Sequence, residues 1–324
     1  MLSIHAYRDA FVSHLEQHIV TREPVNLYNP MNYILGLGGK RLRPVLTLMT
    51  ADIFGNDYKK AMNAAMAIEI FHNFSLIHDD IMDDAPLRRG KETVHEKWDL
   101  NTGILSGDVM LIVAYQFFER YDPEVFHKLA KLFSKTAIEV CEGQQYDIDF
   151  ETRDDVTIDE YLKMITYKTA VLVGAAMEMG AIVTHADEND AKAIYDFGMN
   201  LGIAFQIKDD YLDAFGDPKS FGKQIGGDII ENKKTFLYLK TIEELGNDEA
   251  EQLLHLYAIA PADPSAKIQT VKELMASSGA VDATLKAIEN YTKKALDILN
   301  GLNISAEKKE TLVSFANILM GREV

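Results

Sequence analysis

The sequence predicts an all-α fold. Apolar residues recur at spacings of three and four along most of the 324 residues, which is the period of an amphipathic helix. No convincing series of alternating strands with hairpin turns interrupts this pattern. The segment Ala61–His78 is apolar on almost every face, which suits a central helix packed on several sides. No Ser-, Pro- or Gly-rich linker divides the chain, so we expect one large helical domain covering residues 1–324.

The remaining helices are expected wherever the periodic pattern resumes. In chain order, these runs are Arg43–Asp52, Val109–Arg120, Glu124–Cys141, Ile158–Gly180, Glu188–Phe215, Asn232–Leu245, Asp248–Tyr257, Pro264–Ser277, Ala280–Leu299 and Ala306–Met320. Side chains that can accept hydrogen bonds from free backbone N–H groups precede three of the runs and predict N-caps: Thr157, Asn247 and Ser305. Glycines stand where helices are expected to stop: Gly55, Gly216 and Gly246.

The composition is that of a globular protein with an acidic surface. Hydrophobic residues make up 47% of the chain, with only 8 Pro and 20 Gly, so a large core can form. The net charge of −17 argues against a nucleic-acid partner, because such binding depends on Lys and Arg that neutralise phosphates. A small phosphate ligand remains possible, since divalent cations can reverse the local field in one pocket.

A reducing compartment is the expected location. The single cysteine, Cys141, cannot form an intramolecular disulfide. The first residues show no basic segment followed by an apolar one, as a secretory signal would. The longest strongly apolar stretch, Val171–Val183, contains Glu178 and is too short to cross a bilayer. We therefore expect a soluble, cytoplasmic protein without a transmembrane segment.

Two aspartate clusters are the most informative motifs: DDIMDD at Asp79–Asp84 and DDYLD at Asp209–Asp213. In each, carboxylates four residues apart lie on the same helix face, where they repel one another unless something neutralises them. Magnesium binds one or two carboxylates together with substrate phosphate oxygens, so two such clusters could hold a diphosphate through shared metals.

Two other interpretations of the aspartate clusters are open. A solvated acidic helix face is the simpler alternative for one cluster alone, in a chain this acidic. An EF-hand is disfavoured, since DDIMDDAPLRRG has no Gly at its sixth position and no Glu at its twelfth. Strongly apolar sequence precedes both clusters, which favours burial beside a cavity.

Basic residues stand where a phosphate ligand would need them. The segment GGKRLRP (Gly38–Pro44) places Lys40, Arg41 and Arg43 on a Gly-flanked turn that leads into a helix. Arg88 and Arg89 follow the first aspartate cluster and can form bidentate contacts with phosphate oxygens. Further single candidates are Lys168, Lys223 and Lys233. A solvated surface cation is the alternative for each one taken alone.

In these motifs, the chain resembles the trans-isoprenyl diphosphate synthases of the short-chain farnesyl and geranylgeranyl type. This family is also called the polyprenyl synthetases. The motifs that carry the resemblance are, in order, GGKRLRP, HDDIMDDAPLRRGKETVH, GQQYD (Gly143–Asp147), YKTA (Tyr167–Ala170), FQIKDDYLDAFGD and GKQIGGDI (Gly222–Ile229). They span about two thirds of the chain; the C-terminal third carries little signature.

The resemblance implies the isoprenoid synthase fold: one all-helical domain, usually a homodimer, with a deep central cavity between the helices that bear the aspartate motifs. It implies a prenyltransferase of isoprenoid biosynthesis that condenses isopentenyl diphosphate with an allylic diphosphate (dimethylallyl, geranyl or farnesyl) and releases diphosphate. It also implies Mg²⁺ as cofactor, three ions per active site.

Roles for single residues follow only from the resemblance. The implied magnesium ligands are Asp79, Asp80, Asp83, Asp209, Asp210 and Asp213, and catalysis would rest on all of these but Asp213, together with Lys168. The implied contacts to the allylic diphosphate are Arg88, Lys168, Thr169, Gln206 and Lys223, with Lys233 a further substrate-binding candidate. The implied contacts to isopentenyl diphosphate are Lys40, Arg43, His72 and Arg89. A hydrogen-bonded core histidine is the alternative for His72.

The implied chemistry is consistent with these residue types. Ionisation of an allylic diphosphate creates a carbocation and a leaving diphosphate, so catalysis needs charge stabilisation on the leaving group more than a strong nucleophile. Metals and basic residues supply that stabilisation, and apolar walls exclude water from the cation. The released diphosphate can then take up the proton that the product loses.

Three residues before the first aspartate motif are expected to set the product length. Each residue of a helix advances about 1.5 Å, so Phe71, Phe74 and Ser75 lie one or two turns beneath the motif. In the family, a bulky residue at the position of Phe74 accompanies short products. We therefore expect farnesyl or geranylgeranyl diphosphate. The alternative is that both phenylalanines are ordinary core residues and another helix forms the floor.

Three other functions compete with this interpretation. A longer-chain polyprenyl diphosphate synthase would share the same motifs. A non-catalytic subunit of a heteromeric prenyl synthase is opposed by the intact aspartates. A terpene cyclase would not need the basic residues implied for isopentenyl diphosphate.

Overall fold

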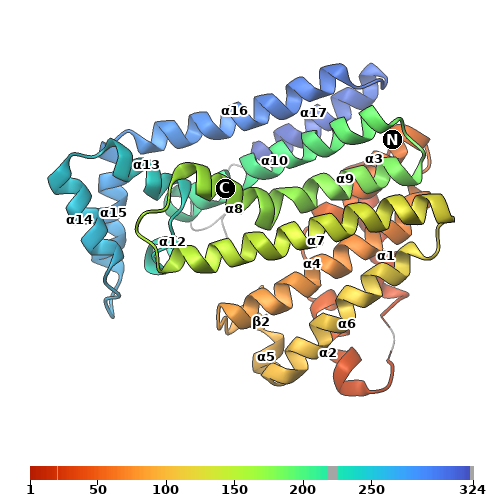
Figure 1. Cartoon of the computed structure of the whole chain (residues 1–324), viewed down its shortest axis with the longest axis horizontal. Coiled ribbons are helices and arrows are strands. Elements are labelled where there is room, and N and C mark those ends of the chain that lie inside the picture. The colour runs from red at the N-terminus through yellow and green to blue at the C-terminus, as the bar shows by residue number, and fades with distance from the viewer. Residues whose placement is uncertain (20, 218–224, 322–324) are drawn as a thin grey trace. The chain divides into compact units, whose positions relative to one another are not determined.

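The computed structural model describes residues 1–19, 21–217 and 225–321, and within them the fold is all-α, as predicted (Figure 1). The chain forms two compact units. Unit 1 comprises Met1–Lys135 with Ala175–Tyr195, and unit 2 comprises Thr136–Gly174 with Asp196–Val324. The expectation of a single domain stays a prediction.

Unit 1 is built around the two helices α4 (Met62–Met82) and α6 (Leu100–Phe118), which pack along one another. The helices α2 (Val25–Gly36) and α3 (Leu42–Gly55) pack on this pair, and α1 (Ile4–Glu16) packs on α3 and α4. A short η1 (Tyr58–Ala61) leads into α4, and α5 (Val94–Lys97) precedes α6.

The predicted central helix is confirmed. Every residue of α4 from Ala64 to Phe71 is buried, as expected for a helix that is apolar all round. The helix runs on to Met82, so Asp79 and Asp80 lie in its last turn. Helix α4 therefore carries the first aspartate motif directly out of the core of unit 1.

Three long helices contribute residues to both units: α7 (Pro123–Glu151), α9 (Val171–Val183) and α10 (Glu188–Phe215). Unit 2 adds α8 (Ile158–Ile165) and, towards the C-terminus, a series of helices coloured cyan to blue in Figure 1. These are α12 (Gly227–Ile230), α13 (Phe236–Glu244), α14 (Asn247–Tyr257), α15 (Ser265–Ser277), α16 (Ala280–Gly301) and α17 (Ala306–Met320). Helix α13 packs against α8 and α16, and α15 packs against α14 and α16.

One predicted helix is interrupted. The run Ile158–Gly180 was expected to be continuous, but residues Thr166–Ala170 form a π-helix, η2, between α8 and α9. A π-helix inserts an extra residue into the turn and is often found at functional sites. This one coincides with the YKTA motif and with Lys168.

Most of the predicted caps are confirmed. The Thr157 side chain accepts a hydrogen bond from the Glu160 N–H in a complete capping box, and the Ser305 side chain accepts one from Lys308. The assignment of Asn247 is wrong by one position, because Gly246 is the N-cap and Asn247 is the first helical residue. The helices end at or beside Gly55, Gly216 and Gly246 as expected.

A short β-ribbon follows the first aspartate motif. The strands β1 (Leu87–Arg88) and β2 (Lys91–Glu92) pair antiparallel, with Arg88 opposite Lys91. The two residues between them have positive φ, 53° at Arg89 and 73° at Gly90, which is the geometry of a type I′ turn. Such a turn matches the twist of paired strands and folds the RRG segment back on itself.

No helix in the described part of the chain is both long and apolar enough to span a membrane.

Candidate active site

In unit 1, Arg88 forms ion pairs with two carboxylates of the first aspartate motif. Its Nε donates to both carboxylate oxygens of Asp80, at 2.8 and 2.7 Å, and its Nη2 lies 2.6 Å from Asp80 Oδ1. The same Nη2 lies 3.4 Å from Asp79 Oδ2. The chain turns at Asp84, where φ is 48°, and then enters β1, which carries Arg88. One guanidinium thus supplies counter-charge to two of the carboxylates assigned to magnesium.

Asp80 is the most enclosed member of the motif. Only 2% of its side chain is exposed, against 19% for Asp79. Burial raises the pKa of Asp80, and the hydrogen bonds from Arg88 act in the opposite direction. Asp83 is exposed at the C-cap of α4. Asp79 and Asp83 were expected to project together, but only Asp79 shares the enclosed setting of Asp80.

Arg43 and His72 meet between α3 and α4, with 3.2 Å between Arg43 Nη1 and His72 Nε2. The pKa of His72 lies well below its usual value, first because of burial and then because of Arg43 and Arg89. A neutral imidazole can accept the Arg43 hydrogen bond at Nε2. The structure therefore brings together two of the residues expected to bind isopentenyl diphosphate, in an electropositive setting.

Arg89 joins this group through the glycine turn. Its Nη1 donates to the Gly38 carbonyl, and its guanidinium lies over Gly39, where a β-carbon would approach Arg89 Cζ to 2.8 Å. Gly39 also has a φ of +117°, a conformation that side chains rarely adopt. Lys40 follows on the same turn and is exposed. The GGK and RRG motifs therefore lie against one another.

Arg41 differs from its neighbours on the turn. It is 6% exposed, pairs with the buried carboxylate of Glu69 and donates to the Leu35 carbonyl. Its role is structural, because a buried guanidinium with these partners is not available to an anion.

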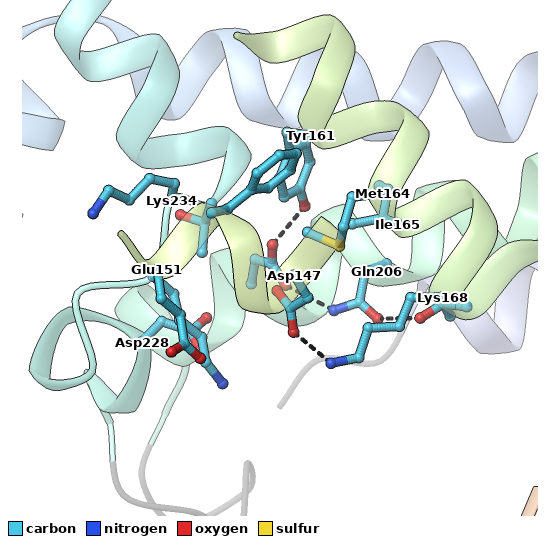
Figure 2. Close-up of a pocket in the computed structure, with 14 residues that line it drawn as sticks. Asp147, Glu151, Tyr161, Met164, Ile165, Lys168, Gln206, Asp228 and Lys234 are labelled. Carbon is cyan, nitrogen blue, oxygen red and sulfur yellow. Dashed lines mark hydrogen bonds and ion pairs between the residues drawn. The ribbon is translucent and has the colours of Figure 1, made fainter. Parts of the chain in front are cut away.

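In unit 2, a cavity of about 130 Å³ lies beside the second aspartate motif (Figure 2). Asp210 accepts hydrogen bonds from Tyr161 Oη at 2.5 Å and from Gln206 Nε2 at 2.8 Å. Thr169 Oγ1 donates to Gln206 Oε1 at 3.1 Å, so Thr169, Gln206 and Asp210 form one chain. Burial, together with Asp209 and Asp147, raises the pKa of Asp210 to about 7.

Lys168 lines the same cavity from the π-helix η2. Its Nζ lies 2.5 Å from Asp147 Oδ2, and Figure 2 shows this amine directed at the carboxylate. The contact depends on Gly143, one turn earlier on α7, where a β-carbon would come within 2.2 Å of the Lys168 backbone nitrogen. The GQQYD and YKTA motifs are thus in direct contact.

The remaining predicted residues of unit 2 vary in setting. Asp209 is half-buried. Asp213 is buried, and its Oδ2 accepts from the backbone N–H of Asp228 at 2.9 Å, which ties it to the start of α12. Lys233 lines the cavity, with 2.8 Å between its Nζ and Glu231 Oε2. Lys223 lies outside the described residues.

Two cavity residues were missed at the sequence level. Asp147 lies at the end of GQQYD, and that motif is the signal that could have identified it. Asp228 lies within GKQIGGDI and was also passed over. Burial, with Asp210 and Asp213 nearby, raises the pKa of Asp228 to about 8. The other lining residues are Phe150, Glu151, Met164, Ile165, Lys234 and Thr235.

The expected chain-length residues belong to an aromatic cluster in unit 1. Phe71 is fully buried and Phe74 is 8% exposed, with 5.4 Å between their ring centroids. Phe133 lies 5.0 Å from Phe71 and packs edge-on against Tyr115 and Phe118. Ser75 Oγ donates to the His72 carbonyl, a local contact within the helix. Phe74 therefore packs against Phe71, which other aromatic rings hold in place.

Comparison with known proteins gives consistent matches. The family model of the polyprenyl synthetases matches residues 24–275, a span that includes both aspartate motifs. Geranylgeranyl pyrophosphate synthase of Geoglobus acetivorans is 38% identical over 314 residues, 95% of either chain. Geranylfarnesyl diphosphate synthase of Natronomonas pharaonis is 34% identical over 330 residues, 95% of this chain and 93% of the relative. A crystal structure of a geranylgeranyl pyrophosphate synthase is similar over 100% of both chains, with 56% identity and a TM-score of 0.96.

Proposed function

Since this chain belongs to the polyprenyl synthetase family, we propose that it condenses isopentenyl diphosphate with an allylic diphosphate to form geranylgeranyl diphosphate. Family membership makes it a trans-prenyltransferase of isoprenoid biosynthesis, acting in short-chain prenyl diphosphate synthesis. The specific product, the metal, the residue roles and the assembly are the parts that we propose.

One observation carries the proposal. In the structure, cations already neutralise carboxylates in both units: Arg88 binds Asp80, and Lys168 binds Asp147. Both cations are the residues that the resemblance assigns to the allylic diphosphate. In each group, divalent cations could pair with the carboxylates and phosphate oxygens of a ligand could pair with the basic side chain.

Magnesium fits the carboxylates that are present. The two motifs offer oxygen ligands alone, as this hard cation prefers. Burial raises the pKa of Asp80 and of Asp210, and a cation beside them would stabilise their ionised forms. The proposed ligands, for three ions per site, are Asp79, Asp80, Asp83, Asp209, Asp210 and Asp213. The ions would supply electrostatic stabilisation of the leaving diphosphate.

The side chains of the protein bind and orient the substrates. Arg88 and Lys168 would move from their carboxylates to the phosphate oxygens of the allylic substrate, with Thr169 and Gln206 beside them, and Lys223 and Lys233 completing the set. Lys40, Arg43 and Arg89 would hold isopentenyl diphosphate. His72 stays neutral and orients the Arg43 guanidinium, since its Nε2 can accept from it.

The reaction needs no nucleophilic side chain. The C–O bond of the allylic diphosphate breaks, the double bond of isopentenyl diphosphate attacks the resulting cation, and the proton lost from the new cation passes to the released diphosphate. Apolar side chains such as Met164 and Ile165 line the cavity beside Asp210 and help to exclude water from it.

The aromatic cluster supports a product of limited length. The ring of Phe74 is held from behind by Phe71, which Phe133 holds in turn. A side chain braced in this way cannot swing aside without disturbing a packed core. We take Phe74 as the floor of the product site, and the curated relatives named geranylgeranyl synthases support a geranylgeranyl product over a farnesyl one.

A homodimer is also part of the proposal. Helix α6 exposes large apolar side chains along one face, a pattern that marks interaction surfaces when the residues are contiguous. They are Leu100, Ile104, Leu105 and Ile112, between 39% and 60% exposed. We also propose a cytoplasmic location, which the single cysteine, Cys141, supports.

A product assay tests the proposal. Purified protein is incubated with Mg²⁺, isopentenyl diphosphate and dimethylallyl, geranyl or farnesyl diphosphate, and the products are dephosphorylated and separated by chromatography. We expect a C20 alcohol, and no turnover when EDTA is added. A C25 or longer product would refute the proposed floor, whereas no diphosphate release with any primer would refute catalysis and favour a non-catalytic subunit.

A further inference from the structure

Beside the first aspartate motif, three side chains converge that the proposed reaction does not use: Asp84, His95 and Glu96. Each offers one ligand atom, and these atoms all lie within 4.8 Å of one another. Within residues 1–19, 21–217 and 225–321, no other group of three or more His, Cys, Asp or Glu residues is so compact. Neither aspartate motif by itself presents such a preformed set.

His95 is the unusual member of this group. Only 9% of its side chain is exposed, and neither Nδ1 nor Nε2 has a hydrogen-bond partner in the structure. Its Nε2 faces Glu96 Oε1 at 3.9 Å, beyond hydrogen-bonding distance. Buried imidazole nitrogens are normally satisfied by protein, ordered water or an ion. Here the enclosed ring has two carboxylates beside it and no bond to either.

Asp84 occupies a position where glycine is usual. It follows the C-cap of α4 with a φ of 48°, and the turn closes through Ala85 N–H to the Asp80 carbonyl at 2.9 Å and Asp84 N–H to the Ile81 carbonyl at 3.3 Å. This is a Schellman motif, whose left-handed residue is commonly Gly and sometimes Asn. An aspartate there is conformationally disfavoured, yet it presents a carboxylate to His95.

The backbone fixes the distance between the two ends of the group. Thr93 precedes His95 and donates from Oγ1 to the Ala85 carbonyl at 2.8 Å, while its N–H donates to the Pro86 carbonyl at 3.2 Å. Thr93 is fully buried. The segment that carries His95 and Glu96 is therefore hydrogen-bonded to the residues directly after Asp84. These bonds hold the backbone of the three residues in a fixed arrangement.

We propose that Asp84, His95 and Glu96 bind one divalent transition-metal ion of the zinc type, at a site separate from the magnesium ligands. Imidazole nitrogen is a ligand for zinc and its first-row neighbours, whereas magnesium takes oxygen ligands and waters. Bonds of about 2.0–2.2 Å to a tetrahedral ion place its ligand atoms roughly 3.4 Å apart. The ligand atoms, which lie within 4.8 Å of one another, need to close by up to about 1.4 Å, and rotation of the exposed Asp84 and Glu96 side chains allows this.

The bound ion would connect the end of α4 to α5. Three protein ligands leave a fourth position for water, the arrangement of an open zinc site. Asp84 directly follows Asp83, so the ion would also fix the turn that presents the last carboxylate of the first motif. Binding to the folded state alone would raise the melting temperature with the logarithm of the ion concentration once that concentration exceeds Kd.

The test is a zinc titration of metal-free protein against a competing chromophoric chelator, in a large excess of Mg²⁺ that occupies sites made only of carboxylates. We expect one zinc equivalent per chain and a higher melting temperature. His95→Gln should weaken binding by more than roughly 100-fold, since even residues behind the metal ligands contribute 10–100-fold. His127→Gln, an exposed histidine on α7, is the matched control and should bind as wild type does.

Two further measurements keep the result decisive if His95→Gln fails to fold. Asp84→Asn and Glu96→Gln alter exposed residues and should each weaken zinc binding by at least tenfold. Pulsed electron paramagnetic resonance of wild type with one equivalent of Cu²⁺ should show coupling to an imidazole nitrogen. Zinc binding that is unchanged in the variants, or a copper spectrum without nitrogen coupling, would overturn the proposal.

Discussion

A β-carbon on Gly143 would lie 2.2 Å from the backbone nitrogen of Lys168, so α7 and the π-helix η2 touch backbone to backbone. Real β-carbons do not approach backbone atoms so closely, and only glycine allows this contact. This close approach determines how near Lys168 lies to Asp147, which follows Gly143 by one turn of α7. Two sequence motifs with no evident link along the chain are thereby joined at one residue.

Gly143→Ala should therefore separate the two helices. We expect the free energy of unfolding to fall by about 1–3 kcal/mol, the range for overpacking a well-packed interior. A shift of about 1 Å at Lys168 should lower kcat/KM for the allylic substrate by roughly 100-fold. Chemical denaturation and steady-state kinetics provide the two measurements.

Gly301→Ala in α16 is the control, because a β-carbon there meets nothing within 4 Å. It should be neutral or slightly stabilising, since Ala is the better helix former by up to about 1 kcal/mol. Equal behaviour of the two variants would contradict the contact between α7 and η2.

Arg88→Lys keeps the positive charge but removes the planar fork that spans Asp80. Hydrogen bonds to charged groups contribute about 1.5–3 kcal/mol, so kcat/KM for the allylic substrate should fall roughly 10- to 150-fold. Arg8→Lys, at an exposed position on α1, is the control and should be silent. Wild-type kinetics in Arg88→Lys would exclude a bidentate role for this side chain.

Phe74→Ala should lengthen the product. Removing the ring opens space beside Phe71, so the growing chain can extend by one or more further five-carbon units. The protein should also lose about 3–5 kcal/mol of stability, the usual cost of a large cavity. Products are compared by chromatography after dephosphorylation.

Two variants separate the loss of stability from the change in length. Phe11→Ala removes a fully buried ring in α1 and should lose stability without changing the product. Phe74→Leu should have a smaller effect on both quantities. An unchanged product in Phe74→Ala would assign the floor to another residue.

Tyr121 gives a pH-dependent prediction. Its hydroxyl donates to the Lys60 carbonyl at 2.8 Å and accepts from the Ala64 N–H at 3.0 Å, which ties the segment after α6 to the start of α4. Burial raises its pKa from 10.0 to about 12. A folded-state pKa above the unfolded one stabilises the fold below pH 10, and this stability is lost as the pH rises from 10 to 12.

Tyr121→Phe should lower the free energy of unfolding by about 0.5–1.5 kcal/mol at neutral pH, the net value of a typical hydrogen bond. The difference between wild type and variant should shrink between pH 10 and 12. Denaturation curves across this range measure it, and a constant difference would mean that the Tyr121 hydroxyl does not titrate in this way.

The sequence allowed the fold class and the motif-bearing helices to be predicted, because periodicity records which helix face is buried. It was less informative where the structure breaks a local rule. Pro30 lies inside α2, where a proline usually argues against a helix. The run through Lys168 reads as one α-helix, since nothing in its composition marks a π-turn. Helix α1, by contrast, could have been recognised, as Tyr7, Phe11 and Leu15 form a regular buried stripe.

The sequence identified those candidate site residues whose role depends on residue type alone. The carboxylates and basic side chains could be named, but their pairings depend on tertiary structure. Arg88 contacts Asp80 after the chain has turned at Asp84, where φ is 48°. The convergence of Asp84 on His95 depends likewise on how the chain turns at the end of α4.

The resting bond between Arg88 and Asp80 has a thermodynamic consequence. A metal ion and the guanidinium compete for the same carboxylate oxygens, so the ion alone gains little from binding. A diphosphate offers Arg88 another partner and at the same time bridges to the ion. Each ligand then raises the affinity of the other by the same factor, as linkage requires. The first aspartate motif would thus bind metal ions weakly on their own, and would bind metal and substrate cooperatively.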